Sequence, residues 1–284
     1  MGGLPAETEI GRVELVVRDL ERSISFYEGM LGLELLDRMV DGEASLGAGG
    51  RPFLVLRGEP EAPPRPPGTT GLFHFAILVP SRPELARSLN RLVERGWRLT
   101  GASDHLVSEA LYLDDPDGIG IEVYRDRPRE EWPHDGDTIR MATLPLDLQG
   151  VMAKLPEAGG AAEGIAAGTK VGHVHLNVAD IGDSERFWCD LVGFDVTVRT
   201  YPGALFVSAG GYHHHVGLNT WNGPGAPPPP EGAIGLERFE VVTATDAVTA
   251  AGERMAGAGV AATHEGGRLR ARDPAGVTVE LVAP

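Results

Sequence analysis

The stretch VELVVRDLERSISFYEGMLGLEL (13–35) recurs in altered form as VHLNVADIGDSERFWCDLVGFDV (174–196). In both stretches an aspartate, Asp19 or Asp180, precedes an aromatic residue by seven positions and a glycine by thirteen. Alternating apolar residues come first, a helical apolar pattern follows the aspartate, and the glycine precedes another apolar run. The repeat therefore predicts a strand, a helix and a second strand, used twice in the chain.

A second pair of segments follows the same plan. FHFAILVPSRPELARSLNRLVERGW (73–97) is similar to ERFEVVTATDAVTAAGERMAGAGV (237–260), and each predicts a strand and a helix. Their continuations end in DPDGIGIEV (115–123) and DPAGVTVEL (273–281), in which the first Asp precedes a Glu by seven residues. The D-P-x-G sequence is typical of a turn, so the Glu is expected in the middle of the strand that follows.

These two repeats predict four modules of the order β-α-β-β-β and an α+β fold. Modules 1 to 4 are expected at residues 10–58, 71–127, 170–222 and 234–284. Proline-rich spacers follow modules 1 and 3, and a longer connection follows module 2. We therefore expect a first domain at 9–127, a linker at 128–169 and a second domain at 170–284.

Composition excludes several functional classes. The formal net charge of −16 disfavours nonspecific binding to nucleic acid or to anionic membranes. A single cysteine, Cys189, excludes an internal disulfide and a cysteine-based zinc site. The N-terminus lacks the pattern of a signal peptide, and no apolar run approaches the length of a membrane span. A cytoplasmic protein is the expectation.

The repeated V-x-D-L-x-x-S-x-x-F-Y-x-x-x-L-G and D-P-x-G…E patterns resemble those of the vicinal oxygen chelate superfamily, over nearly the whole chain. This superfamily includes glyoxalases, bleomycin-resistance proteins and extradiol dioxygenases. The chain is most similar to the two-domain bacterial catechol 2,3-dioxygenases, which act in aromatic hydrocarbon catabolism. The resemblance implies two glyoxalase-like domains with cupped, mixed β-sheets and a metal at the centre of a paired set of modules.

The resemblance also implies where metal ligands lie in each module. The first-strand ligand stands seven residues before the Asp of the V-x-D sequence, or before the residue at its place in the other modules. The last-strand ligand is the Glu after D-P-x-G. These rules assign His74 and Glu122 to module 2 and His173 to module 3, where Gly217 takes the last-strand position. Modules 1 and 4 carry Arg12, Val55, Arg238 and Glu280 at the same places.

Only modules 2 and 3 together supply three ligands, His74, Glu122 and His173. Two histidines and one carboxylate form the facial triad of non-haem Fe(II) oxygenases. The prediction is an Fe(II) site, with Mn(II) or Zn(II) as alternatives and no organic cofactor. It requires modules 2 and 3 to meet, either within one chain or across a homodimer.

The resemblance further implies three catalytic residues. Extradiol dioxygenases carry a tyrosine ten residues before the metal-binding Glu, where Tyr112 stands here. GYHHHVGLN (211–219) is similar to the segment with their general base, and His214 fits that place best. Histidine titrates near pH 6.5, so His214 could take the proton of a diol. Tyr112 would bind a substrate oxygen, and His105 would help to position the substrate.

Each assignment has a structural alternative. His74 and Tyr112 could be packed core residues, His175 competes with His173 as a ligand, and His213 or His215 could replace His214. Strand alternation would turn His214 away from its two neighbours. Glu280 is expected in an ion pair with Arg12 or Arg238, as a former metal site. The aromatic ring of a substrate could lie against Phe75, Ile77, Leu176 or Phe206.

The leading hypothesis is an Fe(II)-dependent extradiol dioxygenase that converts a small aromatic diol and O₂ to a muconic semialdehyde. One alternative is a glyoxalase-type isomerase or a thiol transferase, which would present four protein ligands to Zn, Ni or Mn. The other is a non-catalytic protein that binds an aromatic drug. Fold alone does not separate these functions, whereas metal identity and O₂ uptake do.

Overall fold

A computed structural model describes residues 3–39, 41–136, 138–159 and 164–284. The expected order β-α-β-β-β is confirmed in all four modules. Module 1 contains β1 (Glu9–Val17), α1 (Leu20–Phe26) with a wider turn η1 (Tyr27–Leu31), β2 (Glu34–Arg38), β3 (Glu43–Ala48) and β4 (Arg51–Gly58). Module 2 contains β5 (Gly71–Leu78), α2 (Arg82–Glu94), β6 (Gly101–Asp104), β7 (Ser108–Asp114) and β8 (Gly120–Asp126).

The second half of the chain repeats this plan after a connecting segment. The connection contains η2 (Arg129–Glu131), β9 (His134–Asp135), β10 (Thr138–Ile139), β11 (Leu144–Pro145), α3 (Leu148–Met152) and η3 (Leu155–Ala158). Module 3 contains β12 (Lys170–Asn177), α4 (Ile181–Glu185), η4 (Arg186–Val192), β13 (Asp195–Val198), β14 (Ala204–Ser208) and β15 (Val216–Asn219). Module 4 contains β16 (Gly235–Val242), α5 (Thr245–Gly257), β17 (Ala262–Glu265), β18 (Arg268–Arg272) and β19 (Thr278–Val282).

The chain divides into two compact units. The N unit comprises Leu15–Ala62 and His74–Val171, which is most of modules 1 and 2 with the connecting segment. The C unit comprises Met1–Glu14, Pro63–Phe73 and Gly172–Pro284, which is most of modules 3 and 4.

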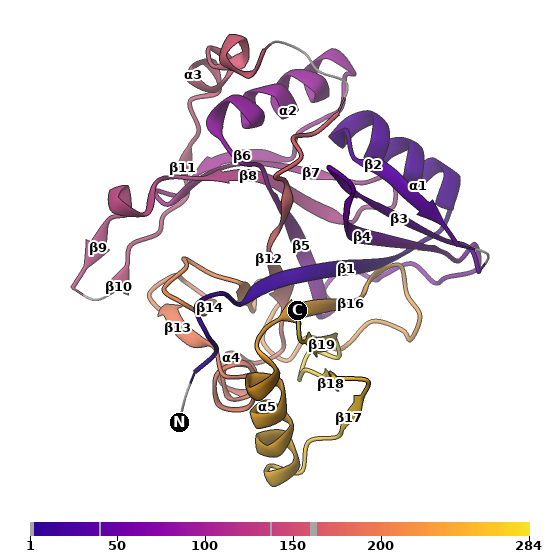
Figure 1. The fold of residues 1–284 in the computed structure, drawn as a ribbon, viewed down its shortest axis with the longest axis vertical. Coiled ribbons are helices and arrows are strands. Elements are labelled where there is room, and N and C mark those ends of the chain that lie inside the picture. The colour runs from indigo at the N-terminus through magenta and orange to yellow at the C-terminus, as the bar shows by residue number, and fades with distance from the viewer. Residues whose placement is uncertain (1–2, 40, 137, 160–163) are drawn as a thin grey trace. The chain divides into compact units, whose positions relative to one another are not determined.

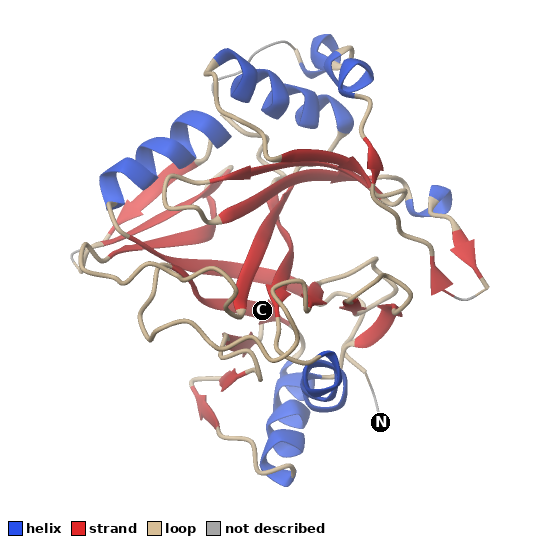
Figure 2. Ribbon diagram, turned by 180° about the vertical axis from the view of Figure 1, so that it is seen from behind, coloured by secondary structure: helices blue, strands red, loops and turns tan. Residues whose placement is uncertain are grey.

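In the N unit, module 2 forms a mixed sheet. The strand order is β11-β6-β7-β8-β5, in which β5 and β8 are parallel and the other neighbours are antiparallel. Helix α2 lies along one face of these curved strands (Figure 1), and Figure 2 shows the same layering from behind. Because β5 and β8 are parallel neighbours, the first and last strands of the module share one face for functional side chains.

In the C unit, module 3 repeats this arrangement. Its strand order is β12-β15-β14-β13, with β12 parallel to β15. Module 4 follows with the order β17-β18-β19-β16, and β16 is parallel to β19. The first and last strands therefore pair in parallel in modules 2, 3 and 4.

Helix caps explain why the repeated aspartates and glycines occur. The Asp19 carboxylate accepts a hydrogen bond from the Arg22 amide at 3.0 Å, and that of Asp180 accepts one from the Asp183 amide at 2.8 Å. Both are N-caps, which satisfy amides that the first helical turn leaves without partners. Gly32 and Gly193 end these helical segments with φ values of 76° and 109°, a backbone conformation that favours glycine.

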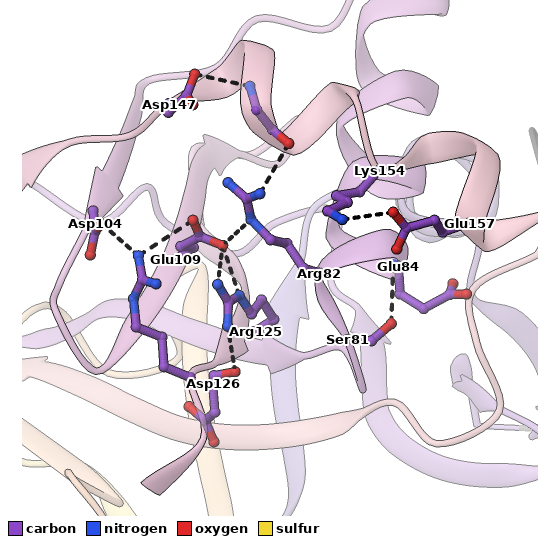
Figure 3. Close-up of polar contacts among 12 residues, drawn as sticks. Ser81, Arg82, Glu84, Asp104, Glu109, Arg125, Asp126, Asp147, Lys154 and Glu157 are labelled. Atoms are coloured by element: carbon purple, nitrogen blue, oxygen red, sulfur yellow. Dashed lines mark hydrogen bonds and ion pairs between the residues drawn. The ribbon is translucent and has the colours of Figure 1, made fainter. Parts of the chain in front are cut away.

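A buried charge cluster in the N unit joins the module 2 sheet to the segment that follows it. Glu109 on β7 is 2% exposed, and its Oε2 accepts hydrogen bonds from Arg82 Nε at 2.8 Å and from Arg125 Nε at 2.7 Å. Figure 3 shows Glu109 between these two arginines. Arg82 also donates to the carbonyl of Gly150 on α3 at 3.0 Å. The cluster therefore ties α2, β7, β8 and α3 together.

The two D-P-x-G turns each bury an aspartate. Oδ1 of Asp115 accepts hydrogen bonds from the amides of Asp117 and Ile119, and Oδ1 of Asp273 accepts them from Ala275 and Val277. Burial raises the pKa of Asp115 to about 6 and that of Asp273 to about 7, against the opposing effect of these amides. Both carboxyl groups therefore bind a proton more readily in the folded chain than in the unfolded chain.

None of the helices among the described residues has the length and apolar character that crossing a lipid bilayer requires.

The pKa of Asp273 predicts how stability depends on pH. Since folding raises this pKa, the stabilising contribution is complete at low pH and is lost as pH rises toward about 7. We expect Asp273→Asn to remove a decline of up to about 1.4 kcal/mol per pH unit in this range. Urea unfolding between pH 5 and pH 8 measures it, with the exposed Asp246→Asn as control. Equal pH slopes for wild type and Asp273→Asn would contradict the assignment.

Candidate metal centre

The buried pair of His74 and Glu122 lies in the N unit. His74 on β5 is 5% exposed and Glu122 on β8 is 2% exposed. Parallel pairing aligns Ala76 with Glu122. His74 precedes Ala76 by two residues, so its side chain lies on the same face of the sheet as that of Glu122. The Nε2 atom of His74 is 2.9 Å from Oε2 of Glu122. Both potential ligand atoms are thus directed to the same small region.

His173 occupies the matching position of module 3, in the C unit. It lies on β12 and is 1% exposed. Its ring centroid is 4.0 Å from that of His214 and 6.0 Å from that of His213. The first strand of module 3 therefore presents a buried imidazole surrounded by further imidazoles.

Each unit holds predicted ligands of its own, His74 and Glu122 in the N unit and His173 in the C unit, and all three are buried. Imidazoles and carboxylates are donors that suit a divalent transition metal. These three residues are the predicted ligands, so the residues present fit a metal. Their role as ligands stays a prediction.

Tyr112 and His105 form a hydrogen-bonded pair next to this group. Register places Tyr112 on β7 directly opposite Glu122, and its hydroxyl is 2.7 Å from His105 Nε2. His105 Nδ1 is 2.8 Å from the carbonyl of Ala142, which can only accept a hydrogen bond. His105 Nδ1 therefore carries a proton, and in the neutral ring Nε2 accepts the hydroxyl proton of Tyr112.

The turn that carries His105 is conformationally unusual. Leu106 has a φ of 70° and is the only non-glycine residue with a positive φ among the described residues. The Asp104 carboxylate accepts a hydrogen bond from the Leu106 amide at 2.8 Å. Such backbone conformations are costly and often occur at functional sites. Sequence reasoning missed both this turn and Ala142, because neither follows from residue type.

The histidine trio is buried, but it does not belong to a strand. His213, His214 and His215 are at most 6% exposed and precede β15, which begins at Val216. Strand alternation therefore does not govern their directions, and that expectation was wrong. Nδ1 atoms of His213 and His214 are 2.7 Å apart, so one donates a hydrogen bond to the other.

His215 has different neighbours from the other two. Its Nδ1 accepts a hydrogen bond from the Ala209 amide at 3.2 Å and lies 2.9 Å from the Ser208 hydroxyl. His214 instead lies between the rings of His173 and Phe206, whose centroids are 4.0 and 4.8 Å away. Of the three, His214 has the shortest ring distance to His173.

The equivalent positions of modules 1 and 4 carry ion pairs, in the C unit. The expectation that Glu280 pairs with arginine is confirmed, because it lies 3.6 Å from Arg238 and 2.5 Å from Arg270. Arg12 pairs with Glu240 at 2.8 Å. Although burial opposes the effect, hydrogen bonds from Arg12 and Arg268 lower the pKa of Glu240 to about 2.

Three of the four expected ring-binding residues lie on other faces. Phe75 neighbours His74 in sequence and therefore points to the opposite face of β5, where its ring packs 6.5 Å from that of Tyr27. The same alternation excludes Ile77 and Leu176. Phe206 contacts His214 and His175, at centroid distances of 4.8 and 5.6 Å, so it remains a candidate.

Comparison with known proteins places the chain in a family. The model of the glyoxalase/bleomycin resistance protein/dioxygenase superfamily matches residues 9–123 and 170–281. The chain therefore belongs to this superfamily and has its two-domain fold, as the sequence predicted.

Individual relatives narrow the comparison. Catechol-2,3-dioxygenase of Bacillus subtilis (strain 168) is 43% identical over 281 residues, which covers 96% of both chains. The structure of a candidate dioxygenase from Bacillus subtilis matches with a TM-score of 0.69 at 14% identity, over 99% of this chain and 86% of that one. Glyoxalase I from Zea mays matches with a TM-score of 0.59 at 17% identity, over 98% and 92%. The two structural likenesses concern the fold.

The geometry predicts that Glu122→Gln greatly weakens metal binding. The substitution keeps the shape of the side chain but removes the anionic oxygen, so affinity for Fe(II) or Zn(II) should fall at least about 100-fold. Metal content after dialysis, together with calorimetric titration, measures this. Glu280→Gln is the matched control, since Glu280 stands at the same place of module 4. Equal metal loss from both variants would contradict the assignment.

Proposed function

We propose that this protein is an Fe(II)-dependent extradiol dioxygenase that cleaves a catechol-type ring to a muconic semialdehyde. The observation that carries the proposal is the buried pair of His74 and Glu122 in the N unit, whose Nε2 and Oε2 atoms are 2.9 Å apart, together with the buried His173 at the matching position of module 3. The 43% identity to a catechol-2,3-dioxygenase across almost the whole chain supports the same reaction class. An aromatic diol and O₂ are the proposed substrates.

Three protein ligands leave part of the coordination sphere of a six-coordinate metal open. Fe(II) bound by these residues would supply a Lewis acid and a path for electrons between the diol and O₂. The chain's contribution is a buried set of neutral and anionic donors that orients the substrate. Mn(II) or Zn(II) can replace Fe(II) in binding measurements, because imidazole and carboxylate donors do not distinguish these ions.

His214 is the proposed general base. Nδ1 of His214 is 2.7 Å from Nδ1 of His213, and in the tautomer in which His214 Nδ1 donates to His213, Nε2 of His214 would accept the proton of the diol. His213 can stabilise the resulting charge, because the two rings share a hydrogen bond whose donor can change. His214 would later return the proton from the same Nε2 atom to the product oxygen.

Tyr112 and His105 are proposed to orient the substrate. The Tyr112 hydroxyl donates to His105 Nε2, so its oxygen lone pairs can accept a hydrogen bond from the remaining hydroxyl of the diol. The Ala142 carbonyl holds His105 in the tautomer that this arrangement needs. Tyr112 is the substrate-binding group in this proposal, and His105 acts through it.

Anaerobic reconstitution with Fe(II), followed by catechol in air, tests the proposal. We expect a yellow semialdehyde and the consumption of one O₂ per ring cleaved. His74→Ala and His173→Ala should each lose bound iron and activity. Iron that survives His173→Ala but is lost from Glu280→Ala would show that the ligand set is wrong. A wild-type protein that binds no metal and consumes no O₂ would favour the drug-binding alternative.

His214→Gln separates proton transfer from metal binding. We expect iron content to stay at the wild-type level while kcat falls by about 10² to 10⁴, the usual contribution of a general base. His215→Gln is the matched control, because its ring contacts Ser208 and Ala209 instead of His173. A larger loss of kcat in His215→Gln would transfer the role of base to His215.

A further inference from the structure

Modules 2 and 3 share one strand register, which makes their residues comparable position by position. In module 2, Ala76 on β5 pairs with Glu122 on β8, which pairs with Tyr112 on β7. The corresponding row of module 3 is His175 on β12, Gly217 on β15 and Phe206 on β14. Gly217 therefore stands where module 2 has its carboxylate, and His175 stands where module 2 has an alanine.

The small Gly217 makes room for the large His175 in module 3, just as the small Ala76 stands beside the large Glu122 in module 2. A Cβ atom at position 217 would lie 2.9 Å from Cγ and Cδ2 of His175, closer than real contacts allow. The glycine is thus required for space, because the imidazole of His175 lies against its backbone. Glycine inside a strand often marks such a close approach. Module 3 therefore has the ring of His175 against Gly217, at the position where module 2 has the carboxylate of Glu122.

Aromatic side chains surround His175 within the C unit. Ring centroids of Phe73, Phe206 and Trp221 are 5.3, 5.6 and 5.3 Å from that of His175. His175 is 4% exposed. We call His175, Phe73, Phe206 and Trp221 the aromatic wall.

The wall is open on one side. Phe73 and Trp221 are 43% and 46% exposed, and they are the only aromatic residues among the exposed large hydrophobic side chains that the structure describes. Their rings also contact each other, at a centroid distance of 5.3 Å. Trp221 is nevertheless fixed, because its Nε1 donates to the Pro202 carbonyl at 3.1 Å and its amide to Asn219 Oδ1 at 3.0 Å. Fixed, exposed aromatic rings suit an apolar ligand.

The wall begins next to a proposed ligand along β12. His175 follows His173 by two residues on the same face of this strand. Two residues along a strand span about 7 Å. This distance matches the reach of an aromatic ring whose two oxygens face the ligands.

We propose that the aromatic wall binds the part of the diol distal to its two oxygens and selects catechols with an apolar ring substituent. His175 is the specificity-determining residue, since it provides the wall at the place where a fourth metal ligand would otherwise stand. The inference rests on the proposed function and names its substrate class. Because module 3 has Gly217 and His175 at the place of a last-strand carboxylate, the proposed metal site has three protein ligands instead of four.

A double-mutant cycle with His175→Ala and Gly217→Ala tests the wall. For 4-tert-butylcatechol, His175→Ala should raise KM about tenfold more than it does for catechol. Gly217→Ala should have a similar effect, because its methyl group displaces the imidazole. In the His175→Ala background, Gly217→Ala should add no further increase. Additive effects of the two substitutions would overturn the proposed contact.

Two further variants separate a wall from a ligand or a structural residue. His175→Phe preserves an aromatic surface, so its metal content and its KM ratio between the two catechols should stay near wild type. Trp221→Ala should lower the preference for 4-tert-butylcatechol, whereas Val93→Ala, an exposed control on α2, should not. Metal loss in His175→Phe, or an unchanged preference in both His175→Ala and Trp221→Ala, would overturn the proposal.

Direct binding distinguishes failure of this inference from failure of the proposed function. Calorimetric titration of both catechols into metal-free and Zn(II)-loaded protein needs no turnover. If wild type lacks ring cleavage but binds 4-tert-butylcatechol more tightly through His175 and Trp221, the wall stands and the reaction assignment fails. If ring cleavage occurs and neither residue affects the preference, the reaction stands and the wall is overturned.

Discussion

A carboxylate buried within an apolar strand requires a cation beside it. Module 2 and module 4 each bury such a carboxylate, but the groups next to it differ. Glu122 and Glu280 stand at the same place after D-P-x-G and are 2% and 3% exposed. Arg238, Arg268 and Arg270 surround Glu280 in the C unit. In the N unit, the imidazole of His74 lies 2.9 Å from Glu122. Since a buried ion without compensation costs several kcal/mol, the proposed metal ion at Glu122 would offset this cost.

Parallel pairing of the first and last strands is the geometric basis of this chemistry. Neighbouring parallel strands in register present alternate residues to one face, so a His two positions before the paired residue approaches the carboxylate opposite. In module 2 the register pairs Ala76, two residues after His74, with Glu122, and in module 3 it pairs His175 directly with Gly217. The same scaffold can therefore carry a ligand, an ion pair or an aromatic ring, depending on a few side chains.

The sequence predicted the parts that depend on local rules. The helix-capping aspartates, the terminal glycines and the D-P-x-G turns each have a residue-level cause, and together they located the four modules. The resemblance to the superfamily, and not a local rule, gave His74, Glu122 and His173 as ligands, and that role stays a prediction. Directions of side chains in irregular backbone could not be predicted, because the trio at 213–215 precedes β15 and obeys no periodicity. Phe75 was only one of four candidates for the ring-binding surface, and the alternation of β5 turns it away from the face of His74.

Contacts from distant segments were beyond sequence reasoning as well, and they matter for the proposed chemistry. A histidine used near a metal needs one ring nitrogen fixed, since the partner of that nitrogen decides which tautomer the other presents. Ala142 does this for His105, and His213 does it for His214. Ala142 lies in the segment 128–169, which the sequence suggested only as a linker. By fixing His105 Nδ1 through a main-chain carbonyl, this segment sets the direction of the Tyr112 hydroxyl without contributing a side chain. A main-chain contact of this kind depends on the path of the backbone, so no residue type in the segment could have revealed it.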